Sequence, residues 1–294
     1  MRFEKVLITG AAGLLGRAVV RELAGRCGLV GLDLWAGEAP ITWHAGDVTD
    51  AAAVHRAMAG CDAVLHIAAM PNIWSGPGER IMRVNVMGTW QVLAAAEAAG
   101  ARRVVLCSSD SVVGFTVREG RMLSPLHLPI DLGHPLRPTE PYGLSKLLGE
   151  ETGRSFANRG LEVVVLRPVF VAYPEMAGEI VARARDPQGY RAPAAGGPAA
   201  AGGGPCWHHV DPRDAARAFR LALELAEVRF ATFFVSAAVT LAPEPTLERL
   251  ARALGHLPEV RRPEIWRENP HAPLYDLGPT RDVLGLAPEH DARL

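Results

Sequence analysis

Residues 5–16 read Lys-Val-Leu-Ile-Thr-Gly-Ala-Ala-Gly-Leu-Leu-Gly, and this stretch decides the fold. Its apolar first half predicts a buried strand, and a helical pattern follows the glycines. Between the two elements, Gly10 allows a sharp turn, Gly13 lets backbone approach a pyrophosphate, and Gly16 permits close packing of the helix. The first N–H groups of that helix, with the helix dipole, would face the phosphates. The stretch therefore predicts a strand–turn–helix unit that binds a dinucleotide.

A carboxylate at the end of the second apolar run favours NAD over NADP. The run covers residues 28–32 and ends in Asp33, about 20 residues beyond the glycines. A carboxylate there can bind both ribose hydroxyls and would repel a 2′-phosphate. The next residues, Leu34 and Trp35, include no arginine that would receive such a phosphate. The alternative interpretation is that Asp33 is only a turn residue.

Later strand–helix units complete the predicted fold. Apolar runs at residues 62–67, 103–107 and 161–166 predict three more strands, and residues 51–59 and 79–99 have helical patterns. Strands and helices that alternate in this way form a doubly wound parallel sheet. We therefore predict an α/β protein with a Rossmann-type doubly wound parallel sheet and a smaller C-terminal substrate lobe.

Polar residues follow several of these strands, at the edge where an open parallel sheet binds its ligand. Asp47 is placed to hydrogen-bond the adenine amine, whereas Asp50 is expected to cap the helix that follows it. Asn85 lies within the long helix, where it would join a proton relay or bond to backbone. The serines and aspartate at residues 108–111 are expected to point into the ligand crevice. A proline-rich loop at residues 118–139 would wall that crevice.

A tyrosine and a lysine four residues apart form the second informative stretch, Tyr142-Gly-Leu-Ser-Lys146. On a helix the two side chains lie on the same face, one turn apart. The ammonium group is expected to lower the pKa of the phenol, which would suit Tyr142 to exchange a hydroxyl proton near neutral pH. Such a group works with a cofactor that exchanges a hydride with an alcohol or carbonyl carbon.

The alternative interpretation is a surface helix that carries both residues by chance. The chain has four Tyr and only two Lys, so 29 of its 31 basic residues are Arg. A Tyr followed four places later by Lys is expected about 0.03 times in such a chain, which favours a function for the pair. A compact ammonium also suits a tight site beneath a tyrosine and a ribose better than a guanidinium does.

Composition bounds the remaining classes of function. The chain has 294 residues, of which 49% are hydrophobic, and a formal net charge of −1, so it can bury a core and has no field that favours nucleic acid. Its four cysteines show no CxxC spacing, which predicts no metal site and suits a reducing cytoplasm. No apolar run approaches about 18 residues and the first strand begins near the N-terminus, so we expect neither a membrane span nor a signal peptide.

The second half of the chain changes in composition. Residues 189–205 consist mostly of Gly, Ala and Pro and are expected to form a mobile loop or lid. We expect residues 1–169 with 206–236 to form the NAD-binding domain, and residues 170–205 with 237–294 to form the substrate lobe. The elements expected in this half are a helix at 211–227, a strand at 230–235 and a helix at 246–254.

Together these residues resemble the extended short-chain dehydrogenases/reductases of the NAD-dependent epimerase/dehydratase type. The resemblance spans about residues 4–215 in the family's order, and a weaker pattern continues to the C-terminus. The matching motifs are Thr9-Gly10-x-x-Gly13-x-x-Gly16, Asp33, Gly46-Asp47, Leu65-His66-x-Ala68-Ala69, Asn85 before Val-Met-Gly-Thr, Ser108-Ser109, Tyr142-x-x-x-Lys146, Leu166-Arg167-Pro168, His209-Val210-Asp211 with Asp214, and finally Tyr275-Asp276 and Leu284-Gly285. The resemblance implies a Rossmann fold, NAD as the cofactor and oxidoreductase chemistry.

The resemblance also implies roles by position. Ser109 would orient the substrate alcohol, Tyr142 would act as acid and base, and Lys146 would hold the nicotinamide ribose. Asp110 and Ser111 would join Ser109 in contacting the substrate. The full set expected to bind NAD is Gly10, Gly13, Leu14, Leu15, Gly16, Asp33, Asp47, Val48, Ala68, Ala69, Asn85, Tyr142, Lys146 and Pro168.

Three departures from the family pattern narrow the substrate. Members that dehydrate sugar nucleotides carry adjacent Asp and Glu, whereas Asp110 is followed here by a serine, and many epimerases carry a tyrosine in place of Val113. Members that bind nucleotide sugars usually have an Asn soon after Arg-Pro, and an Arg-Asp pair before the aromatic residue that precedes His-Val-Asp. This chain has Phe170-Val171 and Pro205-Cys206 at those places, so a nucleotide sugar is not the expected substrate.

Several functions remain to be compared. The first is an NAD-dependent dehydrogenase of a small sugar or sugar acid, because the Ser-Ser-Asp stretch before Gly114-Phe115 is similar to that of uronate dehydrogenases in this family. The runner-up is a nucleotide-sugar epimerase with tightly held NAD. A regulatory NAD sensor is less favoured because such relatives commonly lose the Tyr–Lys pair, and the net charge disfavours a nucleic-acid partner. Family members commonly pair through the helices here at 79–99 and 141–157, which implies a homodimer.

Overall fold

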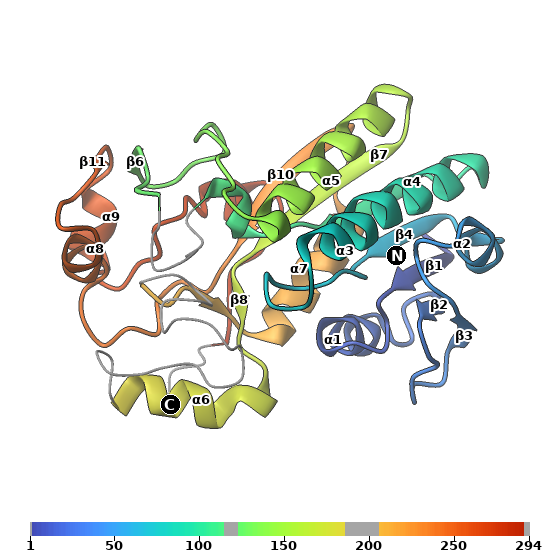
Figure 1. Ribbon diagram of the computed structural model, residues 1–294, viewed down its shortest axis with the longest axis horizontal. Helices are drawn as coiled ribbons and strands as arrows, with labels where there is room; N and C mark the ends of the chain where they lie inside the picture. Colours follow the sequence, from blue (N-terminus) through green and yellow to red (C-terminus); the bar gives the residue numbers. More distant parts are fainter. Residues whose placement is uncertain (1, 115–122, 186–205, 291–294) are drawn as a thin grey trace.

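The computed structural model describes residues 2–114, 123–185 and 206–290, around a seven-stranded parallel sheet (Figure 1). The strands of this sheet are β1 (Lys5–Thr9), β2 (Gly28–Asp33), β3 (Thr42–Ala45), β4 (Ala63–His66), β5 (Arg103–Cys107), β7 (Glu162–Pro168) and β10 (Phe230–Val235). Their spatial order is β10-β7-β5-β4-β1-β2-β3. The order reverses between β1 and β4, which is the switch point where open sheets of this kind bind ligands. The predicted Rossmann-type sheet is confirmed.

Helices cover both faces of the sheet (Figure 1). One face carries α1 (Leu14–Leu23) and α7 (Pro212–Glu224), and the other carries α2 (Ala51–Met58), α4 (Gly88–Ala98) and α5 (Pro141–Asn158). Successive side chains of a strand point to opposite faces, so β1 supplies Val6 and Ile8 to one core and Leu7 to the other. Burial on both faces explains why these strands read as continuous apolar runs. Within the described ranges, no helix combines the length and the apolarity needed to cross a membrane.

Strand β3 is missing from the prediction. It pairs in parallel with β2 at the edge of the sheet, with Thr42 opposite Val30. Its four residues are exposed or half-buried, so no apolar run marks them in the sequence. Pairing with β2, rather than local hydrophobicity, makes this segment a strand.

The helix predicted at residues 79–99 is interrupted. It consists of α3 (Gly78–Met82), a π-helical turn (Arg83–Met87) and α4. The turn contains Asn85, whose carbonyl oxygen accepts a hydrogen bond from the Thr89 hydroxyl at 2.6 Å. Such wide turns are frequent at functional sites because they redirect side chains within a helix.

The remaining elements surround the carboxyl edge of the sheet. They are η2 (Asp110–Val113), β6 (His127–Leu128), β8 (Phe170–Val171), η3 (Pro174–Met176), α6 (Ala177–Arg185), β9 (His209–Val210), α8 (Thr246–Leu254), β11 (Glu259–Val260), α9 (Glu264–Glu268) and α10 (Gly278–Asp282). Strand β6 belongs to the proline-rich loop and pairs with β11, and Ile130 of the same loop forms a parallel bridge with Tyr275. Backbone pairing with the C-terminal region therefore helps to hold this loop.

The second half of the chain agrees with the predicted elements. Helix α7, strand β10 and helix α8 lie where the sequence predicts them, and Asp211 caps α7 by accepting from the Arg213 N–H at 2.8 Å. Strand β10 pairs with β7, so this segment does return to the main sheet. The division into two domains stays a prediction, and the lid expected at residues 189–205 lies outside the described residues.

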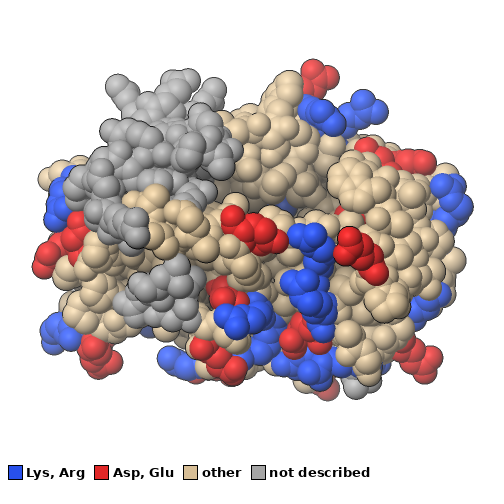
Figure 2. Space-filling view, turned by 90° about the horizontal axis from the view of Figure 1, so that it is seen from below, with Lys and Arg blue, Asp and Glu red and all other residues tan. Residues whose placement is uncertain are grey.

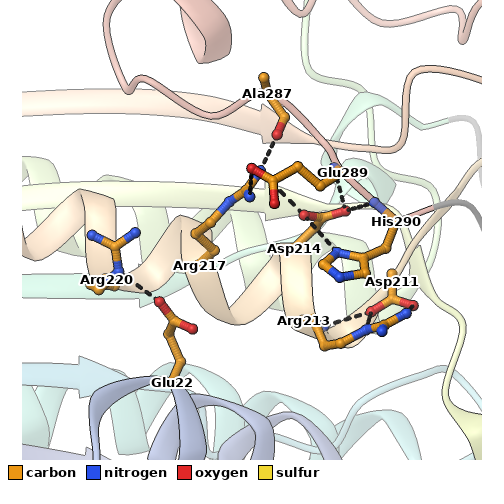
Figure 3. Close-up of polar contacts among 9 residues, drawn as sticks. All are labelled: Glu22, Asp211, Arg213, Asp214, Arg217, Arg220, Ala287, Glu289 and His290. Atoms are coloured by element: carbon orange, nitrogen blue, oxygen red, sulfur yellow. Dashed lines mark hydrogen bonds and ion pairs between the residues drawn. The ribbon is translucent and has the colours of Figure 1, made fainter.

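The C-terminal tail is fastened to α7 by one buried carboxylate (Figure 3). Asp214 Oδ2 accepts hydrogen bonds from the N–H groups of Glu289 at 3.0 Å and His290 at 2.8 Å. Arg217, one turn further along α7, contacts the Ala287 carbonyl oxygen and the Glu289 carboxylate. Asp214, one of the motif residues, therefore anchors Glu289 and His290.

Candidate active site

The glycine turn after β1 is required by the backbone itself. Gly10 has a φ of 73°, and a Cβ on it would lie 2.7 Å from the Ala68 nitrogen. A Cβ on Gly16 would lie 2.0 Å from the Gly10 oxygen, so α1 can approach the turn only without a side chain there. Gly13 is the N-cap of α1 and supplies no side-chain cap, which leaves the first N–H groups of the helix facing outward from the turn. An anionic pyrophosphate fits such a helix end.

Asp33 lies at the end of β2, next to this turn. Its Oδ2 accepts from the Ala12 N–H at 2.9 Å, and its Oδ1 accepts from the Leu34 N–H at 2.8 Å. Each carboxylate oxygen has a second lone pair for a ribose hydroxyl. Leu34 and Trp35 are exposed, at 58% and 63%, and neither brings a positive charge. The cradle therefore fits NAD, with a hydroxyl rather than a phosphate at the 2′ position.

The residues expected around the adenine lie on the loop after β3. Asp47 is exposed, and its Oδ1 accepts from the N–H and the hydroxyl of Thr49, at 2.8 and 2.9 Å. Val48 is buried, and a Cβ on Gly88 would lie 2.8 Å from its side chain. Asp50 caps α2 through the Ala52 N–H at 2.9 Å, which confirms its predicted structural role.

The loop after β4 is tied to α5 by Asn85. Asn85 Oδ1 accepts from the Met70 N–H at 2.8 Å, and Nδ2 donates to the Met70 carbonyl at 3.1 Å and to Ser145 Oγ at 2.9 Å. The half-buried Ala68 and Ala69 precede this anchored residue. Asn85 therefore bonds to backbone, which is one of the two roles expected for it, and the proton relay stays a prediction.

Tyr142 and Lys146 lie in the first turns of α5. The side chain of Glu140 caps the helix, with Oε2 accepting from the Tyr142 N–H and Oε1 from the Gly143 N–H, both at 2.6 Å. Lys146 Nζ donates to the Cys107 carbonyl at the end of β5, at 2.8 Å, and lies 5.7 Å from the centre of the Tyr142 ring. Glu140 is not among the expected site residues, because Glu is not one of the residue types that usually cap the start of a helix.

The expected lowering of the Tyr142 pKa is wrong for this structure. Burial raises the pKa of Tyr142 above its usual value, and nearby acidic groups, Cys107 first and then Asp110 and Glu140, act in the same direction. A hydrogen bond with Ser109 opposes these effects but does not outweigh them. Burial also lowers the pKa of Lys146. Tyr142 is therefore a protonated donor at neutral pH.

A buried ion pair between Arg167 and Glu150 lies beside the candidate catalytic residues. Arg167 on β7 donates from Nε to Glu150 Oε1 at 2.9 Å and from NH2 to Oε2 at 2.7 Å, and Ser108 donates to Oε1 at 2.5 Å. Glu150 lies one turn beyond Lys146 on α5, so the pair joins the helix that carries Lys146 to β7 and to the serine loop. The Arg-Pro motif is therefore structural at Arg167. The role of Glu150 could not be predicted from the sequence, because its partner Arg167 lies on another element.

The serine loop begins directly after β5. Ser109 caps η2 by accepting from the Ser111 N–H at 3.1 Å, and its hydroxyl donates to Asp110 Oδ1 at 3.2 Å. Asp110 Oδ2 accepts from the Tyr275 hydroxyl at 2.8 Å, and burial raises the pKa of Asp110 to about 6. The Ser111 hydroxyl is buried and finds no partner among the described residues. Ser109 is thus close to Tyr142, while Asp110 already uses both its oxygens.

A small cavity of about 20 Å³, lined by both polar and apolar groups, has Lys146 in its wall. Its lining includes the side chains of Asn85, Ser145, Lys146 and Glu150, together with His66. A cavity of this size and polarity can hold one water molecule. His66 is a packed strand histidine whose ring nitrogens contact Thr9 and Thr89 at 2.8 and 3.0 Å.

Pro168 ends β7, and the residues after it form a second small sheet. Phe170 pairs with His209 and Val171 with Val210, so β8 and β9 lie side by side. The half-buried Phe170 occupies the region where relatives that bind nucleotide sugars are expected to carry Asn. Pro205, the other position used to judge the substrate, lies outside the described residues.

A groove of about 870 Å³ runs beside α1 on the underside of the molecule. Figure 2 shows this side, where a column of basic side chains is flanked by acidic ones. Arg17 of the groove pairs with Glu175 at 3.4 Å, and Arg213 pairs with Asp211 at 2.8 Å. Two of the basic side chains that line the groove are therefore paired with acidic ones.

The description "NAD dependent epimerase/dehydratase family" belongs to the family model that matches residues 6–231. The chain belongs to this family. The predicted family and its NAD-dependent class are thereby confirmed. The matched segment runs from the first strand to the last strand of the main sheet, so it includes the glycine turn, Asp33, the serine loop and the Tyr142–Lys146 helix.

Several curated relatives are named as dehydrogenases of sugars or sugar acids. A uronate dehydrogenase of Pseudomonas syringae pv. tomato is 33% identical over 179 residues, which are 59% of this chain and 61% of the relative. An L-arabinose 1-dehydrogenase (NAD(P)(+)) of Haloferax volcanii is 33% identical, covering 55% of this chain and 65% of the relative. The chain spans about three fifths of the length of the uronate dehydrogenases that it matches.

Solved structures extend the similarity to nearly the whole chain. A short-chain dehydrogenase/reductase superfamily protein from Agrobacterium tumefaciens with bound NAD is 27% identical, with a TM-score of 0.71 over 98% of this chain and 94% of that one. A UDP-glucose 4-epimerase from Thermotoga maritima has a TM-score of 0.70 over the same shares at 19% identity, which shows the shared fold.

Proposed function

We propose that this protein is an NAD-dependent oxidoreductase that transfers a hydride between NAD and a hydroxyl-bearing carbon of a small sugar or sugar acid. The observation that carries the proposal is the convergence of Ser109, Tyr142 and Lys146 at the carboxyl end of β5. The Lys146 ammonium binds the last carbonyl of that strand, and the serine hydroxyl lies in the loop that follows it. Three donors of different kinds thus meet beside the switch point of the sheet.

NAD supplies the hydride acceptor when it is bound, and the chain supplies its cradle. The predicted cofactor set would hold it: the turn from Gly10 to Gly16 at the pyrophosphate, and Asp33 at the adenosine ribose. Lys146 keeps two N–H donors beyond its bond to Cys107, and these suit a ribose diol. A positive charge placed nearby on binding would lower the pKa of Tyr142, which burial has raised. Tyr142 would then take the hydroxyl proton of the substrate, while Ser109 orients the same oxygen.

The substrate class follows from the chemistry around the serine loop. A diphosphate needs cationic or N–H donors to replace its lost water. Phe170 and Val171, which follow the Arg-Pro motif, bring no such side-chain donor. The curated relatives described above act, by their names, on uronates and arabinose. These points favour a free sugar or sugar acid, with Ser109, Asp110 and Ser111 forming one side of its site.

The decisive experiment combines turnover with binding. Purified protein is incubated with NAD and a panel of free sugars, uronic acids and UDP-sugars while NADH is followed by its absorbance, and calorimetry measures binding of free UDP. We expect NADH from at least one free sugar or uronic acid and no micromolar binding of UDP. Micromolar UDP binding with interconversion of UDP-sugars, and no net NADH, would instead establish the epimerase alternative.

Three further features are proposed with this function. The protein would form a homodimer through the helices at 79–99 and 141–157, because four large apolar side chains on them are more than a third exposed: Met87, Trp90, Leu144 and Leu148. The substrate lobe would consist of residues 170–205 and 237–294. All four cysteines are free thiols, which suits the proposed cytoplasmic location. Light scattering on the purified protein tests the dimer.

A further inference from the structure

A buried contact joins the serine loop to a distant part of the chain. The Tyr275 hydroxyl donates to Asp110 Oδ2 at 2.8 Å, and the Ser109 hydroxyl donates to Asp110 Oδ1 at 3.2 Å. The carboxylate therefore stands between a tyrosine of the C-terminal region and the serine beside Tyr142. The residues Asp110 and Tyr275 are 165 positions apart in the sequence.

Tyr275 is held too firmly for this contact to be incidental. Its side chain is only 3% exposed. The centre of its ring lies 4.7 Å from that of Phe234, on which it stacks, and 4.9 Å from that of His208. The backbone on both sides of it bonds to Ile130, which donates to the Leu274 carbonyl at 2.7 Å and accepts from the Asp276 N–H at 2.9 Å. The tyrosine hydroxyl is thus presented to Asp110 by a rigid support.

We propose that Asp110 and Tyr275 form a positioning pair that sets the direction of the Ser109 hydroxyl, an inference that rests on the role proposed above for Ser109. A serine hydroxyl has one hydrogen and two lone pairs. With that hydrogen donated to Asp110, and one lone pair taken by the Ser111 N–H at 3.1 Å, Ser109 keeps one lone pair, which faces the Tyr142 hydroxyl and is the one that a substrate alcohol can reach. It then accepts from an alcohol O–H.

The state of Asp110 decides which substrate Ser109 receives. Burial raises the pKa of Asp110 to about 6, while the hydrogen bonds from Tyr275 and Ser109 oppose that rise. Among the described residues, Tyr142 of α5 also interacts with Asp110, whose charge raises the pKa of Tyr142. Above about pH 6 the carboxylate holds the serine hydrogen and an alcohol fits. Below about pH 6, Asp110 is protonated and is a weaker acceptor for the Ser109 hydrogen. Ser109 can then donate that hydrogen to a carbonyl oxygen of the substrate.

The pair can be observed without any substrate. The chain has four tyrosines, so protein labelled with ¹³C at the tyrosine Cζ gives four resonances, which single Tyr→Phe variants assign. We expect the Tyr275 resonance to titrate with a midpoint near pH 6 in the wild type and to lose that titration in Asp110→Asn. A Tyr275 resonance that does not move between pH 4.5 and 8, or that still moves in Asp110→Asn, overturns the pairing.

Kinetics then test the effect on Ser109. Tyr275→Phe keeps the stacked ring and removes the donor, so the pKa of Asp110 rises, and the rising limb of kcat/KM for alcohol oxidation should move up by about one pH unit. Thr280→Val is the matched control, because Thr280 anchors the same C-terminal segment by donating to the Phe234 carbonyl at 2.6 Å without touching Asp110. Its limb should stay at the wild-type pH.

Two kinetic results would overturn the positioning role: a Tyr275→Phe profile that superimposes on the wild type, or an equal shift in Thr280→Val. Asp110→Asn should also raise the KM of the alcohol more than the KM of the corresponding carbonyl compound. If no free sugar or sugar acid is oxidised by the wild type, the proposed function fails, and the resonance titration still decides whether Asp110 and Tyr275 are paired.

Discussion

The proposed cofactor cradle (the Gly10–Gly16 turn with Asp33) and the proposed catalytic loop (residues 108–111) are held in different ways. The cradle is held mainly by backbone N–H groups within one β–α–β unit, as when the Ala12 N–H binds Asp33 and the Gly10 N–H binds the Leu32 carbonyl. The catalytic loop is held by side chains from other elements, with the Glu150–Arg167 pair beneath it and Tyr275 beside it. A dinucleotide site of this kind is therefore encoded within one β–α–β unit, whereas the proposed reacting groups depend on packing among several elements.

Breaking the Glu150–Arg167 ion pair should give the largest change in free energy, and it should disturb the serine loop more than the cofactor cradle. Glu150→Gln leaves the buried Arg167 without its counter-charge, and we expect a loss of about 3–5 kcal/mol in the free energy of unfolding. Urea denaturation measures that change. The control is Glu151→Gln, the neighbouring residue on α5, whose carboxylate makes only an exposed pair with Arg154 at 3.5 Å. A surface pair contributes about 0–1 kcal/mol, so equal losses in the two variants would contradict the support assigned to Glu150.

Removing the Tyr142 hydroxyl should lower turnover but leave NAD binding nearly unchanged. Tyr142→Phe keeps the ring and its packing, so turnover should fall at least about 100-fold, or about 2.7 kcal/mol, while NAD affinity stays within a few-fold. Steady-state rates and fluorescence titration with NAD provide the two measurements. Lys146→Arg should lower both quantities, because a guanidinium does not replace a compact ammonium bound to the Cys107 carbonyl. Retention of most activity by Tyr142→Phe would refute the assignment of the acid–base group.

The smallest expected effect tests the cradle. NAD should bind at least about tenfold more tightly than NADP, a difference of about 1.4 kcal/mol or more, and Asp33→Ala should narrow that gap. Asp33→Asn sharpens the result, since it removes the charge but keeps an acceptor for the Ala12 N–H. If charge repulsion sets the preference, both variants bind NADP better than the wild type does. If the carboxylate acts only by holding the turn, Asp33→Asn should behave like the wild type.

Much of the fold can be predicted because its signals are local. A few neighbouring residues are enough to predict several elements. Examples are the continuous apolar run of β1, the glycines after it and the Asp211 cap of α7. Strand β3 could not be predicted in the same way, since its half-exposed residues become a strand only by pairing with β2. The π-helical turn at Asn85 is equally hidden, because its sequence has the same periodic pattern as the helices on either side.

The sequence by itself determined the family, the cofactor class and the Tyr142–Lys146 pair, because each depends on residue types at short, fixed spacings. Only the tertiary structure decided how these groups are tuned. The pKa of Tyr142 is raised rather than lowered, because burial, a property of the packed protein, has the largest effect on it. The partners Glu150 with Arg167, and Asp110 with Tyr275, meet only when the sheet, α5 and the C-terminal region are assembled. A spacing in sequence predicts which residues share a helix face, but their pKa values depend on the burial and charges of all the groups packed around them.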